Sequence, residues 1–249
     1  TMRLIVAPKS CYKQAPIANG RKVWGPSVQL YCLRSRHNWG IGDFSDLGQL
    51  VEQAAAWGAH FVGLNPIHAL YPANPESASP YSPSSRRWLN VAYINVEAVP
   101  EFLANERLKA DVASPAFQQH LASLRAKENV DYTGVIETKI GMLRQVFDEA
   151  RFSAERQAAF DAFVAAGGDS LQQQAAFDAL QAHFYGKGEN AWGWPVWPDA
   201  FRDYHNPAVA AWMQDHSQDV SFYLYLQFLA DEQLAQADAR AKASGMVMG

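Results

Sequence analysis

The sequence has little cysteine, and this limits both disulfide and metal-site interpretations. Its 249 residues include 2 cysteines, Cys11 and Cys32. Two thiols are too few for a disulfide scaffold, and no second cysteine or histidine lies at a spacing typical of zinc ligands. Both stand in apolar surroundings, in "KSCYK" and "QLYCLRS". We therefore expect reduced, buried thiols in a cytoplasmic protein without a bound metal.

The sequence also lacks long apolar runs and an excess of basic residues. No run reaches the roughly 18 apolar residues of a membrane-spanning helix, and no signal peptide is recognisable. The formal net charge is −4, whereas nucleic-acid binding needs a basic face. We expect neither a membrane nor a nucleic acid as partner. With 49% hydrophobic and 18% charged residues, the chain has the composition of a globular protein with ample core.

The first hundred residues alternate short apolar runs with one amphipathic segment. Strands are predicted over 3–8, 27–33 and 60–70. The segment 45–58 has helical spacing, with Asp43 or Ser45 as the cap at its start and Gly58 at its end. A strand, a helix and a strand with short links predict a βαβ unit, so the second and third strands should be parallel.

Consecutive helices are predicted beyond residue 100. One of them starts at Ser114-Pro115, where Ser is the cap and Pro lies in the first turn. Further helices are expected over 132–150, 153–168, 169–186, 206–216 and 219–245. After Gly245, residues 246–248 look like the opening of another buried strand, so we expect the chain to be a piece of a longer protein.

Five segments occur in an order that is specific as a set, although no single one is decisive. They are "NWGIGDFSDL" (38–47), "GLNPIHAL" (63–70), "SPYSPSSRRWLNVAYINV" (79–96), "VDYTGVIETKIGMLRQVF" (130–147) and "WGWPVWPDAFRD" (192–203). The set resembles the amylomaltase family, also called 4-α-glucanotransferase or disproportionating enzyme, and especially the long form of the bacterial maltose system. The resemblance covers most of the chain.

This resemblance implies an α/β fold, an incomplete (β/α)8 TIM barrel of two to three strands with a large all-helical insertion. A complete barrel usually needs about 250 residues, so the length fits but the number of strands does not. The expected divisions are a tail of a preceding domain or linker (1–20), the start of the barrel with a sugar-binding loop (21–100), the helical insertion (101–244) and a truncated strand (245–249).

The family's activity is retaining transfer of α-1,4-glucan segments between maltooligosaccharides. An Asp holds the donor sugar as a covalent ester, a Glu is the acid/base, and neither a metal nor an organic cofactor is needed. The motifs of the nucleophile, the acid/base and a stabilising Asp lie further along the family's sequence and match nothing here. We therefore assign no catalytic residue and expect the 249-residue chain to be inactive alone.

Four residues are predicted to contact the maltooligosaccharide. In the family, the Tyr of the Ser-Pro-Tyr segment stacks on the sugar at the cleavage point, and Tyr81 matches it. A ring buries the C–H face of glucose while hydroxyls reach polar neighbours. Ser79 would offer a hydroxyl, although a turn-stabilising role is nearly as good an interpretation. Asn90 and Trp39 complete the set, and an Asn often bonds to its own loop backbone instead.

Other residues have competing interpretations. Asp43 ends a barrel strand, but helix capping explains it better than catalysis, and Gly40 and Gly42 suit a tight turn with positive φ. Lone histidines such as His68 are typical of packing. Arg86 and Arg87 are expected to form salt bridges with the insertion. Trp192, Trp194 and Trp197 are expected to pack where helices meet, and the alternative is that they line a glucan groove.

Two rival functions remain open from the sequence. One is a glycoside hydrolase of the α-amylase type, which shares the barrel and the retaining chemistry. The other is a non-catalytic module for glucan binding or helical interaction, which would bind sugar by itself.

Overall fold

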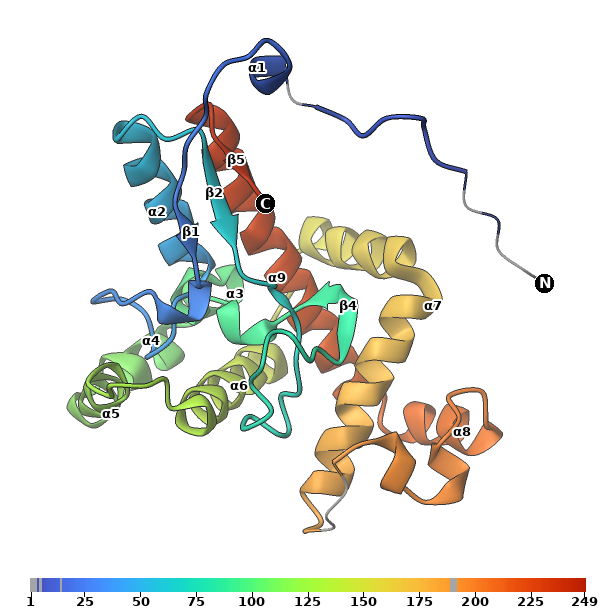
Figure 1. The fold of residues 1–249 in the computed structure, drawn as a ribbon. Helices are drawn as coiled ribbons and strands as arrows, with labels where there is room; N and C mark the ends of the chain where they lie inside the picture. The colour runs from blue at the N-terminus through green and yellow to red at the C-terminus, as the bar shows by residue number, and fades with distance from the viewer. Residues whose placement is uncertain (1–3, 5, 14, 189–191) are drawn as a thin grey trace.

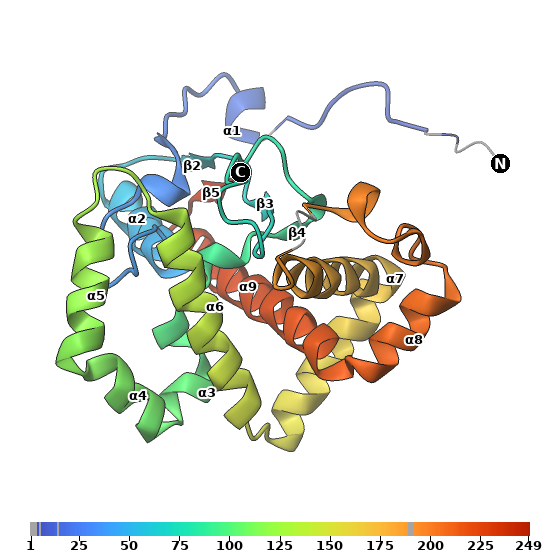
Figure 2. The same ribbon diagram turned by 90° about the horizontal axis from the view of Figure 1, so that it is seen from below.

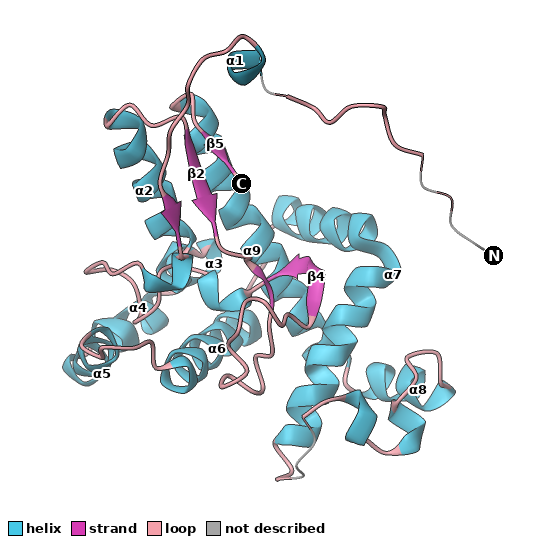
Figure 3. Cartoon of the chain, viewed as in Figure 1, coloured by secondary structure: helices cyan, strands magenta, loops and turns pink. Residues whose placement is uncertain are grey.

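The chain is mostly helical with a small parallel sheet (Figure 1, Figure 3). The computed structural model describes residues 4, 6–13, 15–188 and 192–249. The strand predicted at 3–8 is wrong where it can be checked, because residues 4 and 6–8 form no strand, while residues 3 and 5 lie outside the described residues.

The sheet has the order β1-β2-β5, with β1 at Ser27–Val28, β2 at Phe61–Leu64 and β5 at Val247–Met248. Both pairings are parallel, with Ser27 opposite Gly63 and Phe61 opposite Val247. The predicted βαβ unit is therefore confirmed, and residues 246–248 do open a third strand. In Figure 2, α2 and α9 lie on the same side of these strands.

The strands are shorter than the sequence predicted, and two residues, Asn65 and Pro66, explain the difference. The chain leaves β1 for a 3-10 helix at Leu30–Cys32, because the Leu30 N–H donates to Asn65 Oδ1 at 2.8 Å instead of to a strand. Shortly after β2, Pro66 has no N–H for a ladder. The chain then turns into β3 (His68–Ala69), which pairs antiparallel with β4 (Ser85–Leu89).

The longer helices agree with the sequence predictions, whereas the short helices at 15–18, 100–103 and 106–113 were not individually predicted. They are α1 (Ala15–Ala18), α2 (Phe44–Ala56), α3 (Pro100–Leu103), α4 (Glu106–Ala113), α5 (Pro115–Arg125), α6 (Tyr132–Glu149), α7 (Ala154–Tyr185), α8 (Pro207–Asp215) and α9 (Ser217–Ala243). Further 3-10 helices lie at Val91–Tyr93, Val96–Ala98, Trp194–Val196 and Asp199–Phe201. The two helices predicted over 153–186 form the single element α7, which is kinked at Gly168, where φ is 54° and ψ is −151°.

The core is centred on α9, which packs against α2, α6, α7, α8 and β5 (Figure 2). Its aromatic side chains meet those of neighbouring helices. The ring centroids of Phe222 and Phe147 are 5.7 Å apart, and those of Phe228 and Phe160 are 5.6 Å apart. Pairs at such separations add to the stabilisation from buried area.

The two cysteines lie in different surroundings from those expected. Cys11 and Cys32 are both free thiols but exposed, so the prediction of burial is wrong. Cys32 lies in a short 3-10 helix beside a hollow rather than in a buried strand. Among the described residues, no helix is long and apolar enough to cross a membrane.

Candidate functional site

A hollow of about 490 Å³ opens where β1 and β2 end. We call it the Tyr81 hollow. It is lined by Ser27, Val28, Gln29, Cys32, Leu33, Leu64, Asn65, Pro66 and Tyr81. No lining residue belongs to α2 or α9, the helices that pack on the strands. Barrel enzymes place their sites at the carboxyl ends of strands, so this hollow is the candidate functional site.

Tyr81 is presented to solvent at the rim of this hollow, with 69% of its side chain exposed. Tyr31 lies close by: burial raises its pKa, and Cys32 and Tyr81 add to the increase. Ser79 is also exposed, and its carbonyl accepts a hydrogen bond from the Ser82 N–H at 3.1 Å. Both Ser79 and Tyr81 are thus accessible to a ligand.

The loop that carries Tyr81, residues 70–84, is fastened at its base and along its length. Ser84 Oγ donates to the carbonyls of Ala69 (3.1 Å) and Leu70 (2.7 Å). Tyr185 on α7 donates to Asn74 Oδ1 at 3.4 Å, and Thr133 on α6 donates to the Glu76 carboxylate. The Tyr81 loop is therefore held between the sheet region and the helices α6 and α7.

Asn65 fixes the floor of the hollow, a role that the sequence reasoning missed. It is buried, with Oδ1 accepting from Leu30 N and Nδ2 donating to the Pro66 carbonyl at 2.8 Å. Burial raises the pKa of Tyr93 to about 12, against hydrogen bonds from Asn65 and Asn90 that lower it. The available signal was a polar residue placed directly after a strand, in "GLNPIHAL".

Asn90 and Trp39, two of the predicted sugar contacts, lie inside the protein. Asn90 is 6% exposed, and its Oδ1 accepts from the Ala92 N–H at 3.0 Å. Trp39 is 2% exposed; its indole N–H donates to Glu97 at 2.9 Å, and its ring packs edge-on against Phe117. Neither lines the Tyr81 hollow, so this structure does not bring them together with Tyr81 there, and Ser79 is not among the lining residues either.

Asp43 caps α2, as the sequence indicated. Its carboxylate accepts from the backbone N–H groups of Ser45 (2.9 Å) and Asp46 (3.0 Å), and the Asp43 N–H donates in turn to the Asp46 carboxylate at 3.1 Å. Burial raises the pKa of Asp43 to about 6. Gly40 has the expected positive φ of 89°. Gly42 does not, but a Cβ there would lie 2.0 Å from the Leu30 carbonyl oxygen.

Lys139 is a buried cation that the sequence reasoning did not single out. It comes from α6, is 1% exposed, and donates to the carbonyls of Ala92 (2.7 Å) and Ile94 (2.9 Å). Burial lowers its pKa to about 8, although Asp43 and Asp46 oppose that change. Lys139 thus ties α6 to the segment that follows β4.

The three tryptophans do not share one environment. Trp197 is 2% exposed and stacks on Phe177 at 5.5 Å, which confirms the packed-joint interpretation for this residue. Trp192 and Trp194 are 53% and 56% exposed, so that interpretation is wrong for them. Arg86 and Arg87 are exposed on β4 and have no ion pair within the described part of the chain, contrary to expectation.

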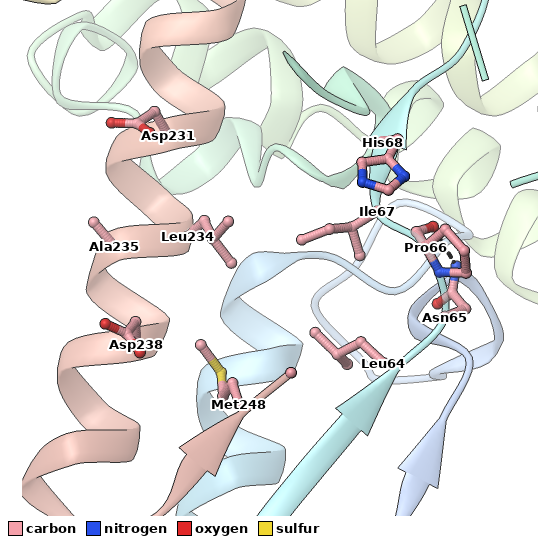
Figure 4. Close-up of a pocket in the computed structure, with 11 residues that line it drawn as sticks. Leu64, Asn65, Pro66, Ile67, His68, Asp231, Leu234, Ala235, Asp238 and Met248 are labelled. Carbon is pink, nitrogen blue, oxygen red and sulfur yellow. Dashed lines mark hydrogen bonds between the residues drawn. The ribbon is translucent and has the colours of Figure 1, made fainter. Parts of the chain in front are cut away.

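A second hollow at the same edge is larger, at about 560 Å³, and lies between β2, β5 and α9 (Figure 4). Leu64, Ile67, Leu234 and Met248 give it an apolar lining, with His68, Asp231 and Asp238 also among the lining residues. Leu64, Asn65 and Pro66 separate it from the Tyr81 hollow, because they line both. An apolar lining suits packing better than a sugar.

The described residues contain no group of three or more His, Cys, Asp or Glu side chains that could hold a metal ion. The side chains that line the Tyr81 hollow offer an aromatic ring, amides, a serine hydroxyl and the Cys32 thiol.

Comparison with known proteins identifies the family. The family model described as 4-alpha-glucanotransferase matches residues 28–249. A 4-alpha-glucanotransferase of Haemophilus influenzae is 38% identical over 256 aligned positions, which cover 100% of this chain and 36% of that protein. One from Mycobacterium tuberculosis is 38% identical over 243, covering 92% of this chain and 32% of that protein. The chain thus spans about a third of the length of these relatives.

Solved structures agree. The amylomaltase of Corynebacterium glutamicum superposes with a TM-score of 0.74 at 33% identity, over 92% of this chain and 30% of that one. The amylomaltase of Streptococcus agalactiae, solved in complex with acarbose, gives 0.71 at 18% identity over 92% of this chain and 42% of that one, a likeness of fold alone. From its sequence and its fold, this chain belongs to the 4-alpha-glucanotransferase family.

Proposed function

We propose that the protein containing this chain is a 4-α-glucanotransferase that moves α-1,4-glucan segments between maltooligosaccharides by retaining double displacement. The observation that carries this proposal is the family match over residues 28–249. The parallel strands β1, β2 and β5 would be the first strands of a (β/α)8 barrel, and the helices between β4 and α9 its insertion. Their parallel pairing supports this assignment.

In this proposal, Tyr81 stacks on the donor glucose beside the cleavage point, and Ser79 offers a hydroxyl. The exposure of both residues on a fastened loop supports these roles, and Tyr81 also lines the hollow. A rigid support restricts the loop before the ligand arrives, which lowers the entropic cost of binding.

Asn90 and Trp39 were predicted as direct contacts. In this conformation they would instead support the binding surface from the protein interior, without touching the sugar. Asn90 holds the turn after β4 through Ala92, and Trp39 braces the loop before α2 through Glu97. Direct contact with a sugar would require either side chain to leave these hydrogen bonds.

The catalytic carboxylates are proposed to lie outside the 249 residues. We therefore expect the full-length protein to convert maltotriose into glucose and longer glucans at a constant total of reducing ends. The 249-residue chain should give no turnover. Turnover by the chain alone would contradict the location of the catalytic groups, and a rise in reducing ends with the full-length protein would indicate a hydrolase.

Tyr81 can be tested in the full-length protein. Tyr81→Ala should lower kcat/KM for maltotriose about tenfold or more, because a stacked ring stabilises the bound sugar. Tyr81→Phe keeps the ring and should retain most activity. Tyr12→Ala removes another exposed ring, 88% accessible, and serves as the control. Equal activity of Tyr81→Ala and wild type would remove Tyr81 from the site.

A further inference from the structure

One face of α7 carries three polar side chains beside β4 and the end of the Tyr81 loop. Ser170, Gln174 and Asp178 follow one another at intervals of four residues, so they lie on the same side of the helix. β4 packs against α7 (Figure 1), and Trp88 on β4 donates to the Ser170 carbonyl at 3.1 Å. The helix is thus fastened to the strand next to the point where the Tyr81 loop ends.

Ser84 closes the Tyr81 loop. Its N–H donates to the Ala69 carbonyl at 2.8 Å, and its hydroxyl donates to the Leu70 carbonyl at 2.7 Å, so the two ends of the loop are joined here. The Ser84 hydroxyl oxygen also accepts a long hydrogen bond, at 3.4 Å, from the side-chain amide of Gln174. Because the amide donates, the single hydroxyl hydrogen stays available for the carbonyls across the loop. Gln174 therefore supports the bond that closes the loop.

Asp178 sets the orientation of the Gln174 amide. Gln174 Nε2 lies 3.1 Å from each carboxylate oxygen of Asp178. The two side chains are 7% and 3% exposed, so water does not compete strongly for them. An ionised carboxylate can only accept, so it holds the NH2 group of the amide toward itself and leaves the second hydrogen for Ser84. The reverse orientation would place the amide oxygen against the carboxylate.

The charge of Asp178 changes near neutral pH. Burial raises its pKa to about 7, and the hydrogen bond from Gln174 opposes the increase. Tyr223 of α9 is the titratable group that interacts with it from another helix. Burial raises the pKa of Tyr223, Asp178 adds to the increase, and Arg144 and Asp219 act on it in opposite directions, so Tyr223 stays neutral. Protonated Asp178 gains an O–H that can donate to the Gln174 amide oxygen, which favours the reverse orientation.

We propose that Gln174, oriented by Asp178, is a positioning residue that holds the Tyr81 loop closed for sugar binding. The sugar rests on the proposed function, whereas the contacts that hold the loop do not depend on it. Tyr81 stacks on the sugar in the bound substrate and in the transition state alike, so a looser loop raises KM and leaves kcat nearly unchanged. The ionised form of Asp178 binds the sugar more tightly than the neutral form.

The first test uses Gln174→Leu in the full-length protein, which removes the amide and keeps a side chain of similar size. At pH 8, KM for maltotriose should rise about threefold, because one hydrogen bond is lost, with kcat within about twofold. Gln157→Leu is the matched control and should leave KM unchanged, because Gln157 donates to Asp161 at the same spacing on an exposed part of α7.

A double-mutant cycle shows whether the effect passes through Tyr81. In the Tyr81→Ala background, Gln174→Leu should add nothing to KM, because the ring that the loop positions is gone. An equal rise of KM in both backgrounds overturns the proposal, as does an unchanged KM in the single variant.

The pH profile tests the role of Asp178. Between pH 6 and pH 8, KM of the wild type should fall about twofold relative to KM of Asp178→Asn, whose side chain is neutral throughout. Taking the ratio removes the titration of other groups, such as the buried Asp43. Parallel profiles of the two proteins overturn the proposal.

Hydrogen exchange of residues 70–84 gives a readout that needs no activity. Exchange at pH 8 should be about threefold faster in Gln174→Leu than in the wild type and Gln157→Leu, because a loosened loop opens more often. If Gln174→Leu does not fold, Ser84→Ala should show the same rises in exchange and KM, and Ser84→Thr, which keeps a hydroxyl, should show smaller ones. Unchanged exchange overturns the proposal. Absence of maltotriose transfer in the wild type would instead overturn the proposed function, while exchange still tests the loop.

Discussion

The region of the sheet and the region of the helices are held together by different interactions. Between residues 27 and 96, strands are short, and buried polar side chains bond to backbone groups. Asn65, Asn90 and Asp43 are the main examples, joined by Lys139 from α6. In the helical region, α6, α7 and α9 meet through aromatic rings such as Phe147 and Phe222.

The two regions satisfy the hydrogen-bonding groups of their backbones in different ways. Helices satisfy their own N–H and C=O groups, so apolar side chains are free to form the contacts between them. In the sheet region, backbone groups in the turns and 3-10 helices beside the short strands lie outside any ladder, as the Leu30 N–H and the carbonyls of Ala92 and Ile94 do. Side-chain amides, carboxylates and one ammonium group bond to them instead.

The largest expected loss of stability comes from breaking the aromatic contact. Phe222 is 1% exposed, and Phe222→Ala should lower the free energy of unfolding by about 3–5 kcal/mol, because it removes buried area and leaves a cavity. Urea denaturation measures this loss. Leu103→Ala, at a residue that is 54% exposed, should change stability little; equal losses would contradict the assignment of the core.

A somewhat smaller loss is expected from removing the buried ammonium group. Lys139→Met keeps the length of the side chain but leaves the carbonyls of Ala92 and Ile94 without their donor. The free energy of unfolding should fall by about 2–4 kcal/mol. Lys127→Met on the surface is the matched control. If Lys139→Met proves as stable as wild type, the hydrogen bonds from Lys139 contribute little to the stability of the sheet region.

The smallest effect should be a gain, at a polar side chain in the aromatic region. Asp178 on α7 is 3% exposed, and burial raises its pKa to about 7 from 3.8, opposed by a hydrogen bond from Gln174. The folded state favours the neutral form, so wild-type stability declines as pH rises from about 4 to 7. Asp178→Asn should remove the contribution of Asp178 to this decline, leaving that of the buried Asp43, and raise stability by about 1–3 kcal/mol at pH 8.

Urea denaturation of both proteins at pH 4, 6 and 8 tests this expectation. Glu155→Gln, which alters an exposed carboxylate in the first turn of the same helix, is the control and should follow the wild type. A variant that loses stability at pH 8 would mean that the Asp178 carboxylate is stabilised in a way that its hydrogen bonds from Gln174 do not explain.

The helices could be predicted from sequence because their signals are local. Ser114 and Ser153 cap α5 and α7 through their own hydroxyls, and apolar spacing marks α6. The strands were predicted too long, because nothing in "SVQLYCL" shows that Asn65 takes the Leu30 N–H. Likewise, one tryptophan-rich segment gave no sign that Trp197 would be buried while Trp194 is exposed.

Part of the candidate site could also be predicted from the sequence. Tyr81 was placed after a barrel strand, and the structure puts it at the rim of a hollow at strand ends. The burial of Trp39 depends on Phe117 of α5, which packs on it from elsewhere in the chain, whereas Asn90 caps the 3-10 helix that directly follows it, the local alternative that the sequence left open. Such tertiary contacts leave no local pattern.

The loop at residues 70–84 has one more consequence. It is tied to α6 through Glu76 and to α7 through Asn74 before any ligand arrives. The position of the Tyr81 ring therefore depends in part on Thr133 and Tyr185, which are distant from it in the sequence. A substitution in either helix that breaks these bonds would act on the Tyr81 hollow without touching it.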